Sequence, residues 1–177
     1  TQTFYEVEAK YFCDSSGDSI LAPLCDAEFR MGRESGKEFG EDTDLEEADN
    51  MTMGMSCLLQ GRETTKDIKF TAPEWSTKLT SEHFEKRKID LSSEYLNYWW
   101  LELGGNRNTI DDTEELRDEL VALAVGTWDH IKNSGEYDSS KWELDFLSFL
   151  PGKRESRRMM GEYIITERDI SGGRVFE

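Results

Sequence analysis

A short acidic turn that contains a glycine is the first place in this sequence where ligand chemistry could occur. The turn consists of Asp14, Ser15, Ser16, Gly17 and Asp18. It follows an alternating apolar run at residues 7–13 and precedes a helix-like segment at residues 19–24, which predicts a short buried strand, a turn and a helix. Gly17 can adopt a positive φ, and free N–H groups at the helix start would favour an anion such as a phosphate. By its spacing alone, the turn is more typical of a plain strand–helix connection than of a ligand site.

A cluster of cations near the end of the sequence is the second candidate. Four of the 21 basic residues fall within six positions, at Lys153, Arg154, Arg157 and Arg158. The cluster follows a strand-like run at residues 143–150. Guanidinium groups bind carboxylates and phosphates through paired hydrogen bonds, so the cluster indicates an anion-binding site. Ion pairing with the acidic excess of the chain is an equal alternative.

The cysteines and histidines show no metal-binding pattern. Cys13, Cys25 and Cys57 match no zinc or CxxC spacing, and their apolar surroundings predict small buried residues. Their odd number argues against a disulfide framework and favours a reducing, cytoplasmic compartment. His83 and His130 lie far apart, and we expect each at the surface or at a helix end. The sequence therefore predicts no metal site, and it singles out no catalytic acid or base.

The composition is that of an acidic globular protein. The 177 residues contain 38 acidic and 21 basic side chains, for a formal net charge of −17, and 11% of them are aromatic. The aromatic content excludes a disordered acidic tail. The negative charge disfavours nucleic acid and anionic membranes as partners. No apolar stretch approaches the roughly 20 residues that span a bilayer, so we expect no membrane partner.

Periodicity outlines a mixed α and β protein. Strand patterns occur at residues 51–60, 95–103, 143–150 and 159–165. Apolar residues recur every three or four positions between residues 111 and 135, which predicts a long helix. A short helix start or turn is expected at residues 166–170. We therefore expect the α+β class, with helices packed on a sheet.

Several motifs follow one another in the order found in one enzyme family. They are the turn from Asp14 to Asp18 with Leu21 and Ala22, and residues 27–34, 98–100, 104–105, 117–120, 128–133 and 149–158. The sequence resembles the bacterial FAD-dependent oxidoreductases with a glutathione-reductase-like flavin domain. Because the matches are long and cover nearly the whole chain, this resemblance is far more specific than the acidic turn alone.

The resemblance implies a division of the chain and a set of site residues. Residues 1–30 would be the remnant of an FAD-binding domain, a partial βα unit, and residues 31–177 a substrate-side domain with a mainly antiparallel sheet. Asp14, Ser15, Ser16, Gly17 and Asp18 would pass beside the FAD, and Arg154, Arg157 and Arg158 would bind the substrate. The family turn usually reads Asp-Cys-Thr-Gly-Asp-Gly. Ser15, Ser16 and Ser19 depart conservatively from it, which leaves the backbone role of Gly17 in place.

The implied function is an oxidation in which FAD accepts a hydride from a small substrate. A flavin domain needs a Gly-x-Gly-x-x-Gly turn for the pyrophosphate, but Gly32, Gly36 and Gly40 have the wrong spacing. We therefore expect an internal portion of a longer enzyme, inactive by itself and unable to retain FAD. Its partners would be the small-molecule substrate and the missing flanking flavin-domain segments. The alternative is a non-catalytic acidic binding module derived from such an enzyme.

Overall fold

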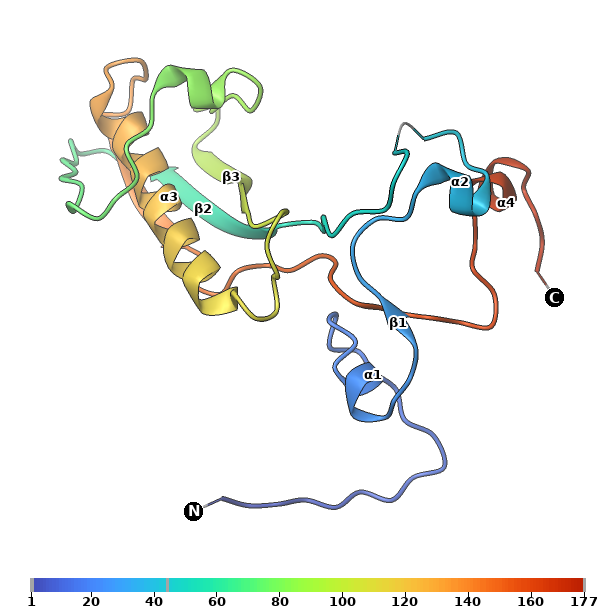
Figure 1. Ribbon diagram of the computed structural model, residues 1–177. Helices are drawn as coiled ribbons and strands as arrows, with labels where there is room; N and C mark the ends of the chain where they lie inside the picture. The colour runs from blue at the N-terminus through green and yellow to red at the C-terminus, as the bar shows by residue number, and fades with distance from the viewer. Residues whose placement is uncertain (1, 44, 177) are drawn as a thin grey trace.

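The structure combines helices with antiparallel sheets, which confirms the α+β class. The structure is a computed structural model that describes residues 2–43 and 45–176. Figure 1 shows a larger body, built on the longest helix and strands, and a peripheral region that carries the shorter elements. In chain order the elements are α1 (Leu21–Leu24), β1 (Phe29–Arg30), α2 (Gly36–Phe39), β2 (Met55–Glu63), the 3₁₀ helix η1 (Ser81–Phe84), β3 (Tyr95–Leu103), α3 (Thr113–Asn133), β4 (Trp142–Leu147), β5 (Arg158–Met159) and α4 (Glu167–Ser171).

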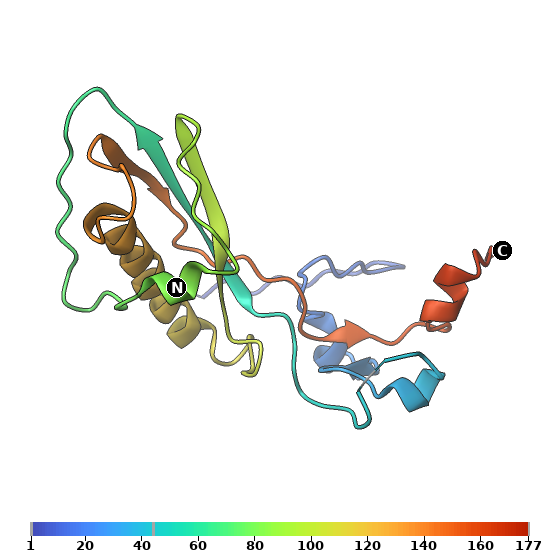
Figure 2. The same cartoon turned by 90° about the horizontal axis from the view of Figure 1, so that it is seen from above.

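A three-stranded antiparallel sheet, in the order β3-β2-β4, forms the centre of the larger body. Alternation along β2 places Met55, Cys57 and Leu59 on one face, where each is at most 2% exposed. The helix α3 packs on this same face, as Figure 2 shows. Burial of apolar side chains between helix and sheet is the main source of stability for such a layer. The remaining core residues are Phe84, Ile89, Leu96, Tyr98, Leu101, Leu116, Leu120, Ala124, Trp128, Ile131 and Trp142.

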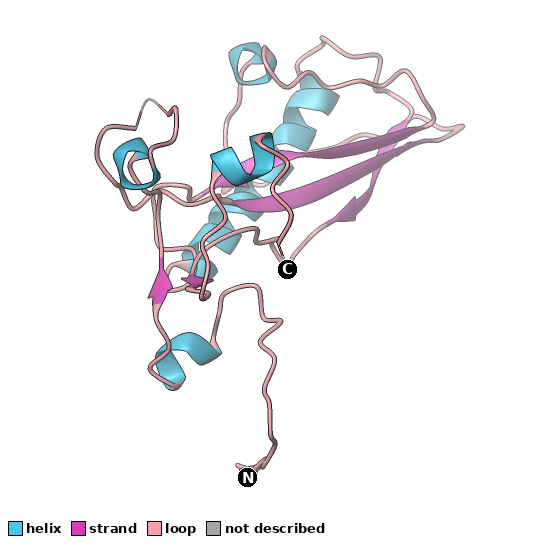
Figure 3. Cartoon of the chain, turned by 90° about the vertical axis from the view of Figure 1, so that its right-hand side faces the viewer, coloured by secondary structure: helices cyan, strands magenta, loops and turns pink. Residues whose placement is uncertain are grey.

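The opposite face of this sheet keeps large side chains in contact with solvent. Register shifts between Cys57 and Leu59, so that Leu58 stands opposite both Trp99 and Trp100 of β3. An extra residue on one strand of a pair is a β-bulge, which bends the strand and redirects its side chains. Both indoles are consequently about half exposed. Figure 3 shows α3 crossing the strands of this sheet on one side.

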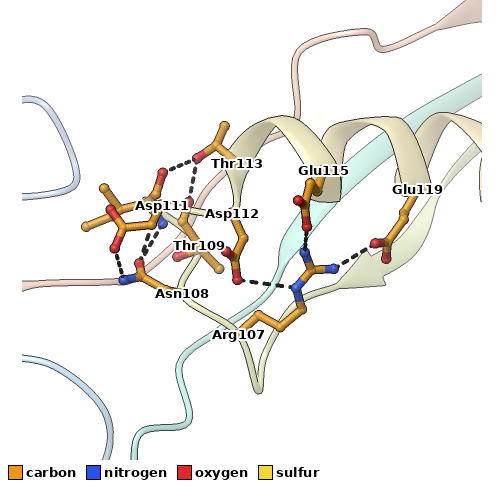
Figure 4. A network of polar contacts seen from close by, with 9 residues as sticks. Arg107, Asn108, Thr109, Asp111, Asp112, Thr113, Glu115 and Glu119 are labelled. Atoms are coloured by element: carbon orange, nitrogen blue, oxygen red, sulfur yellow. Dashed lines mark hydrogen bonds and ion pairs between the residues drawn. The ribbon is translucent and has the colours of Figure 1, made fainter.

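A network of polar contacts fixes the N-terminal half of α3 (Figure 4). Arg107, in the loop after β3, donates hydrogen bonds to Asp112 at 3.3 Å, Glu115 at 2.8 Å and Glu119 at 2.7 Å. Carboxylates near a helix N-terminus interact favourably with the helix dipole, and the arginine relieves their mutual repulsion. The network therefore ties the loop after β3 to the outer face of the helix.

The two-stranded pair β1–β5 joins the beginning of the chain to its end. Phe29 pairs with Met159 and Arg30 with Arg158. This pairing places the basic segment that follows β4 beside the chain that leaves α1. It is the element that makes a common site from two distant stretches of sequence.

One predicted strand does not form. Residues 7–13 contain no strand, and Val7, Tyr11 and Phe12 are 68%, 79% and 66% exposed. A strand needs a neighbouring strand for its backbone hydrogen bonds, and none of the described residues provides one here. Residues 7–13 therefore alternate without forming a strand, and the prediction of a buried strand is wrong for this chain.

The other strands differ from prediction at their ends. The strand expected from residue 51 begins at Met55, and the one expected to reach residue 150 ends at Leu147. The strand expected at residues 159–165 is limited to β5. By contrast, the long helix and the strand at residues 95–103 form as predicted.

The cysteines and His130 occupy partly unexpected environments. Cys57 is buried, as predicted, whereas Cys13 and Cys25 are exposed, so the prediction for these two is wrong. Both lie in the N-terminal stretch that lacks a packed sheet. His130 lies in the last turn of α3, as expected, but it is only 7% exposed and stacks on Phe84 at 4.7 Å between ring centroids.

Candidate functional site

The acidic turn is held in shape by its own side chains. Asp14 Oδ1 accepts hydrogen bonds from the backbone N–H of Ser16 at 2.8 Å and from its hydroxyl at 2.6 Å. Gly17 adopts a φ of +82°, and a Cβ added there would meet no atom within 4 Å. The positive φ that the sequence predicts at Gly17 is confirmed, and the backbone at this residue is open on one side.

The start of α1 is already occupied by the protein's own acceptors. Asp14 Oδ2 accepts a hydrogen bond from the N–H of Leu21 at 2.8 Å, and Ser16 Oγ accepts one from the N–H of Ile20 at 3.2 Å. Hydrogen bonds from Ser16 and then from Leu21 lower the pKa of Asp14 below its usual value. An ionised carboxylate therefore takes the place where free N–H groups were expected, and that expectation is wrong.

Asp18 connects the acidic turn to the basic segment. Its Oδ1 accepts a hydrogen bond from the Ser156 hydroxyl at 2.7 Å, and its Oδ2 pairs with Lys153 Nζ at 3.0 Å. The backbone carbonyl of Asp18 accepts a further hydrogen bond from Arg157 Nε at 2.9 Å. Ser156 is fully buried, so this contact is shielded from solvent. Two segments more than 130 residues apart thus form one site.

Two opposing effects, burial and contact with the basic segment, set the pKa of Asp18. Burial by itself would raise the pKa, but the hydrogen bonds from Ser156 and Lys153 and the charges of Lys153 and Arg157 outweigh it and lower the pKa. Ionised Asp18 can accept both hydrogen bonds at once. The site is consequently most stable when this carboxylate carries its charge.

Arg157 and Arg158 are engaged by the protein itself. Besides its bond to Asp18, Arg157 lies over the ring of Phe29 at 5.6 Å. Arg158 donates to the carbonyl of Gly32 at 2.7 Å and to Glu34 at 2.8 Å, and it also pairs with Glu155. These contacts hold β5 and the segment before it against the chain around β1.

Arg154 differs from its neighbours. It is exposed, and its guanidinium lies over the ring of Trp99 at 5.7 Å. In the part of the chain that the structure describes, it has no hydrogen-bond or ion-pair partner. Of the three arginines singled out by the sequence, Arg154 is the one whose donors face solvent.

Sequence reasoning missed two residues of this site, Ser156 and Trp99, and it assigned Lys153 to an external anion rather than to Asp18. Lys153 and Ser156 bind Asp18, and Trp99 supports Arg154. Lys153 and Ser156 belong to the basic motif, so the motif was itself a signal. Nothing in the spacing indicated that their partner would be Asp18, because that contact depends on the β1–β5 pairing.

Comparison with known proteins identifies the family. A model of the FAD dependent oxidoreductase family matches residues 1–177, the whole chain. The chain belongs to this family. The same comparison found no curated protein and no solved structure that matches this family member.

The turn from Asp14 to Asp18 could meet only one part of an FAD molecule. Carboxylates accept hydrogen bonds from hydroxyls and repel phosphates, so a turn with Asp14 and Asp18 suits the hydroxyl-bearing part of FAD rather than its pyrophosphate. The open side of Gly17 leaves room for close approach. These are the residues of this family member that could hold the cofactor.

Among residues 2–43 and 45–176, no three His, Cys, Asp or Glu side chains are grouped so that they could hold a metal ion. Within the same described residues, no helix combines the length and the apolar character needed to cross a membrane.

Proposed function

We propose that this chain is the internal, mostly substrate-binding portion of an FAD-dependent oxidoreductase that acts on a small anionic substrate. The observation that carries the proposal is the contact of Asp18 with Lys153, Ser156 and Arg157. It connects the turn proposed to meet the cofactor with the basic segment proposed to meet the substrate. A substrate beside this segment would therefore lie near the cofactor.

The residues of the site have different proposed roles. Gly17, with Asp14 and Asp18, offers the cofactor an open backbone and hydroxyl acceptors. Arg154 is the residue with donors available to an anion, while Arg157 and Arg158 position the segment that carries it. When bound, FAD supplies the redox chemistry by accepting a hydride. The chain itself binds and orients the substrate, and it supplies positive potential in an otherwise acidic protein.

The exposed N-terminal stretch supports the proposed partner of this chain. Phe4, Tyr5 and Tyr11 are 88%, 86% and 79% exposed, although residues 7–13 have the alternation of a half-buried strand. Large apolar side chains at this density favour a covering surface. We assign that surface to flavin-domain segments flanking this chain, with residues 1–30 belonging to the FAD-binding domain and residues 31–177 to the substrate-side domain.

FAD retention tests the proposal. Extended by its flanking segments, the protein should purify with a flavin absorption band, whereas the 177-residue chain should not. Gly17→Val should reduce retention in the extended protein, because a β-branched residue is strained at positive φ. Gly135→Val is the matched control, since Gly135 has a φ of +81° and equally open surroundings. It should retain FAD.

Two outcomes would overturn the proposed function. One is an extended protein without flavin, which would favour the non-catalytic binding module. The other is equal FAD retention by Gly17→Val and Gly135→Val, which would remove the acidic turn from the cofactor site. A flavin band in the 177-residue chain alone would contradict the view that this portion cannot hold FAD.

A further inference from the structure

The open face of the sheet carries two adjacent tryptophans and two arginines. Trp99 and Trp100 lie at the bulge in β3, are 45% and 44% exposed, and stack with ring centroids 4.4 Å apart. The guanidinium of Arg154 lies over Trp99 at 5.7 Å, and that of Arg87 lies over Trp100 at 5.3 Å. A guanidinium held on an aromatic ring keeps donors available for an anion. This group therefore combines an aromatic surface with positive charge.

Arg154 is the member of this group with unused donors. Arg87 donates a hydrogen bond to the carbonyl of Trp100 at 2.9 Å. Nothing among the described residues accepts one from Arg154, although acidic residues outnumber basic ones by 38 to 21. Its neighbours Lys153 and Arg157 are already bound to Asp18. The positive charge beside Trp99 is thus available to a ligand.

Apolar side chains continue from Trp99 across the same face. Leu58 stands opposite the bulge and is partly buried, and Phe146 of β4 is 47% exposed. Between the outer strands, Gln60 of β2 is paired with Phe146 on one side and with Asn97 on the other. The amide nitrogen of Gln60 donates a hydrogen bond to the side-chain oxygen of Asn97. The face thus offers an apolar surface that is bordered by the amide side chains of Gln60 and Asn97 and by Arg154.

We propose that this face binds a flat aromatic monocarboxylate, with its ring on Trp99 and Leu58 and its carboxylate on Arg154. Aromatic rings gain stability from offset or edge-to-face contact with an indole. One guanidinium matches one carboxylate through two parallel hydrogen bonds. A phosphate dianion would need more positive charge than Arg154 alone supplies. The identification of this ligand as the substrate rests on the proposed function, whereas its binding does not.

Binding can be measured on the 177-residue chain without flavin. The indole N–H signals of the five tryptophans are followed by NMR while benzoate is added. We expect the signals of Trp99 and Trp100 to shift and those of the buried Trp128 and Trp142 to stay. Cyclohexanecarboxylate, which has no aromatic ring, and benzamide, which has no charge, should each bind about tenfold more weakly than benzoate.

Matched variants separate this site from other exposed residues. Arg154→Gln and Trp99→Leu should each weaken benzoate binding about tenfold, because one removes the charge and the other the stacking surface. Trp75→Leu and Arg168→Gln change an exposed tryptophan and an exposed arginine elsewhere on the chain. Both should leave binding within about twofold of the unmodified chain.

Three results would overturn this inference. They are the absence of any shift at Trp99 or Trp100, equal binding of cyclohexanecarboxylate, and unchanged binding by Arg154→Gln. The first result is also expected if another protein segment or a second copy of the chain covers this face. Benzoate binding by a protein whose extended form lacks FAD would uphold the binding site and reject the proposed function. FAD retention by the extended protein without benzoate binding would uphold the proposed function and reject the binding site.

Discussion

Removal of the Ser156 hydroxyl tests whether Asp18 holds the two parts of the candidate site together. Ser156 is fully buried and donates to Asp18 at 2.7 Å, and the Asp18 side chain is 13% exposed. A hydrogen bond to a charged group contributes about 1.5–3 kcal/mol. Ser156→Ala removes this hydrogen bond and leaves Oδ1 of Asp18 without its donor. Local opening of the contact should therefore become roughly 10- to 150-fold more frequent.

Hydrogen–deuterium exchange measures this opening directly. The N–H groups of Leu21, Cys25 and Ala27 are hydrogen bonded around α1, so their exchange reports release of this segment. Exchange there should accelerate in Ser156→Ala, while the melting temperature of the distant helix-and-sheet core stays unchanged.

A second serine provides the control. Ser148→Ala removes a hydrogen bond of the same 2.7 Å length, to the carbonyl of Leu150, without touching Asp18. It should leave exchange around α1 unchanged. If Ser156→Ala and Ser148→Ala exchange at the same rate, Asp18 does not hold the segments together and the reasoning is refuted.

Three further predictions concern the core, the helix and pH. Leu59→Ala should lower the free energy of unfolding by about 2–5 kcal/mol in a urea titration, because Leu59 is fully buried, whereas Leu58→Ala on the open face should lower it by less than about 1 kcal/mol. Equal losses would contradict the assignment of the two sheet faces. Gly126→Ala should lower the melting temperature despite the better helix propensity of alanine, since its Cβ would lie 2.0 Å from the carbonyl oxygen of Thr77, and a rise would contradict this packing. The pKa of Asp18 is lowered by folding, so the stability that it adds is present above its ordinary value of 3.8 and is lost as the pH falls below that value. An NMR titration of the Asp18 carboxylate should show a midpoint below 3.8. A midpoint above 3.8 would contradict this prediction, because it would mean that folding raises the pKa of Asp18.

Secondary structure was predictable where the local pattern was long. The aromatic run at residues 95–103 and the helix from Thr113 to Asn133 both form as expected. Each has enough periodic side chains to mark one face as apolar. The run at residues 7–13 is shorter, and alternation alone cannot supply the partner strand that its backbone needs.

The candidate site was predictable only in its separate parts. Both the turn around Gly17 and the cluster around Arg154 could be recognised from residue types and spacing. Their connection through Asp18 and Ser156 could not, because it depends on the pairing of β1 with β5. The likeness of the three arginines in sequence also hid their different environments, since Arg154 alone lies on Trp99.

The sequence by itself determined the class of the fold, the long helix, the aromatic strand and the resemblance that the family match confirms. These features depend on local periodicity and on motifs whose order is written along the chain. Tertiary structure decided which residues work together. It joined Asp18 to the basic segment, occupied the start of α1 with Asp14, and placed Arg154 on an exposed tryptophan. Such choices depend on contacts between residues far apart in the chain, which spacing alone does not encode.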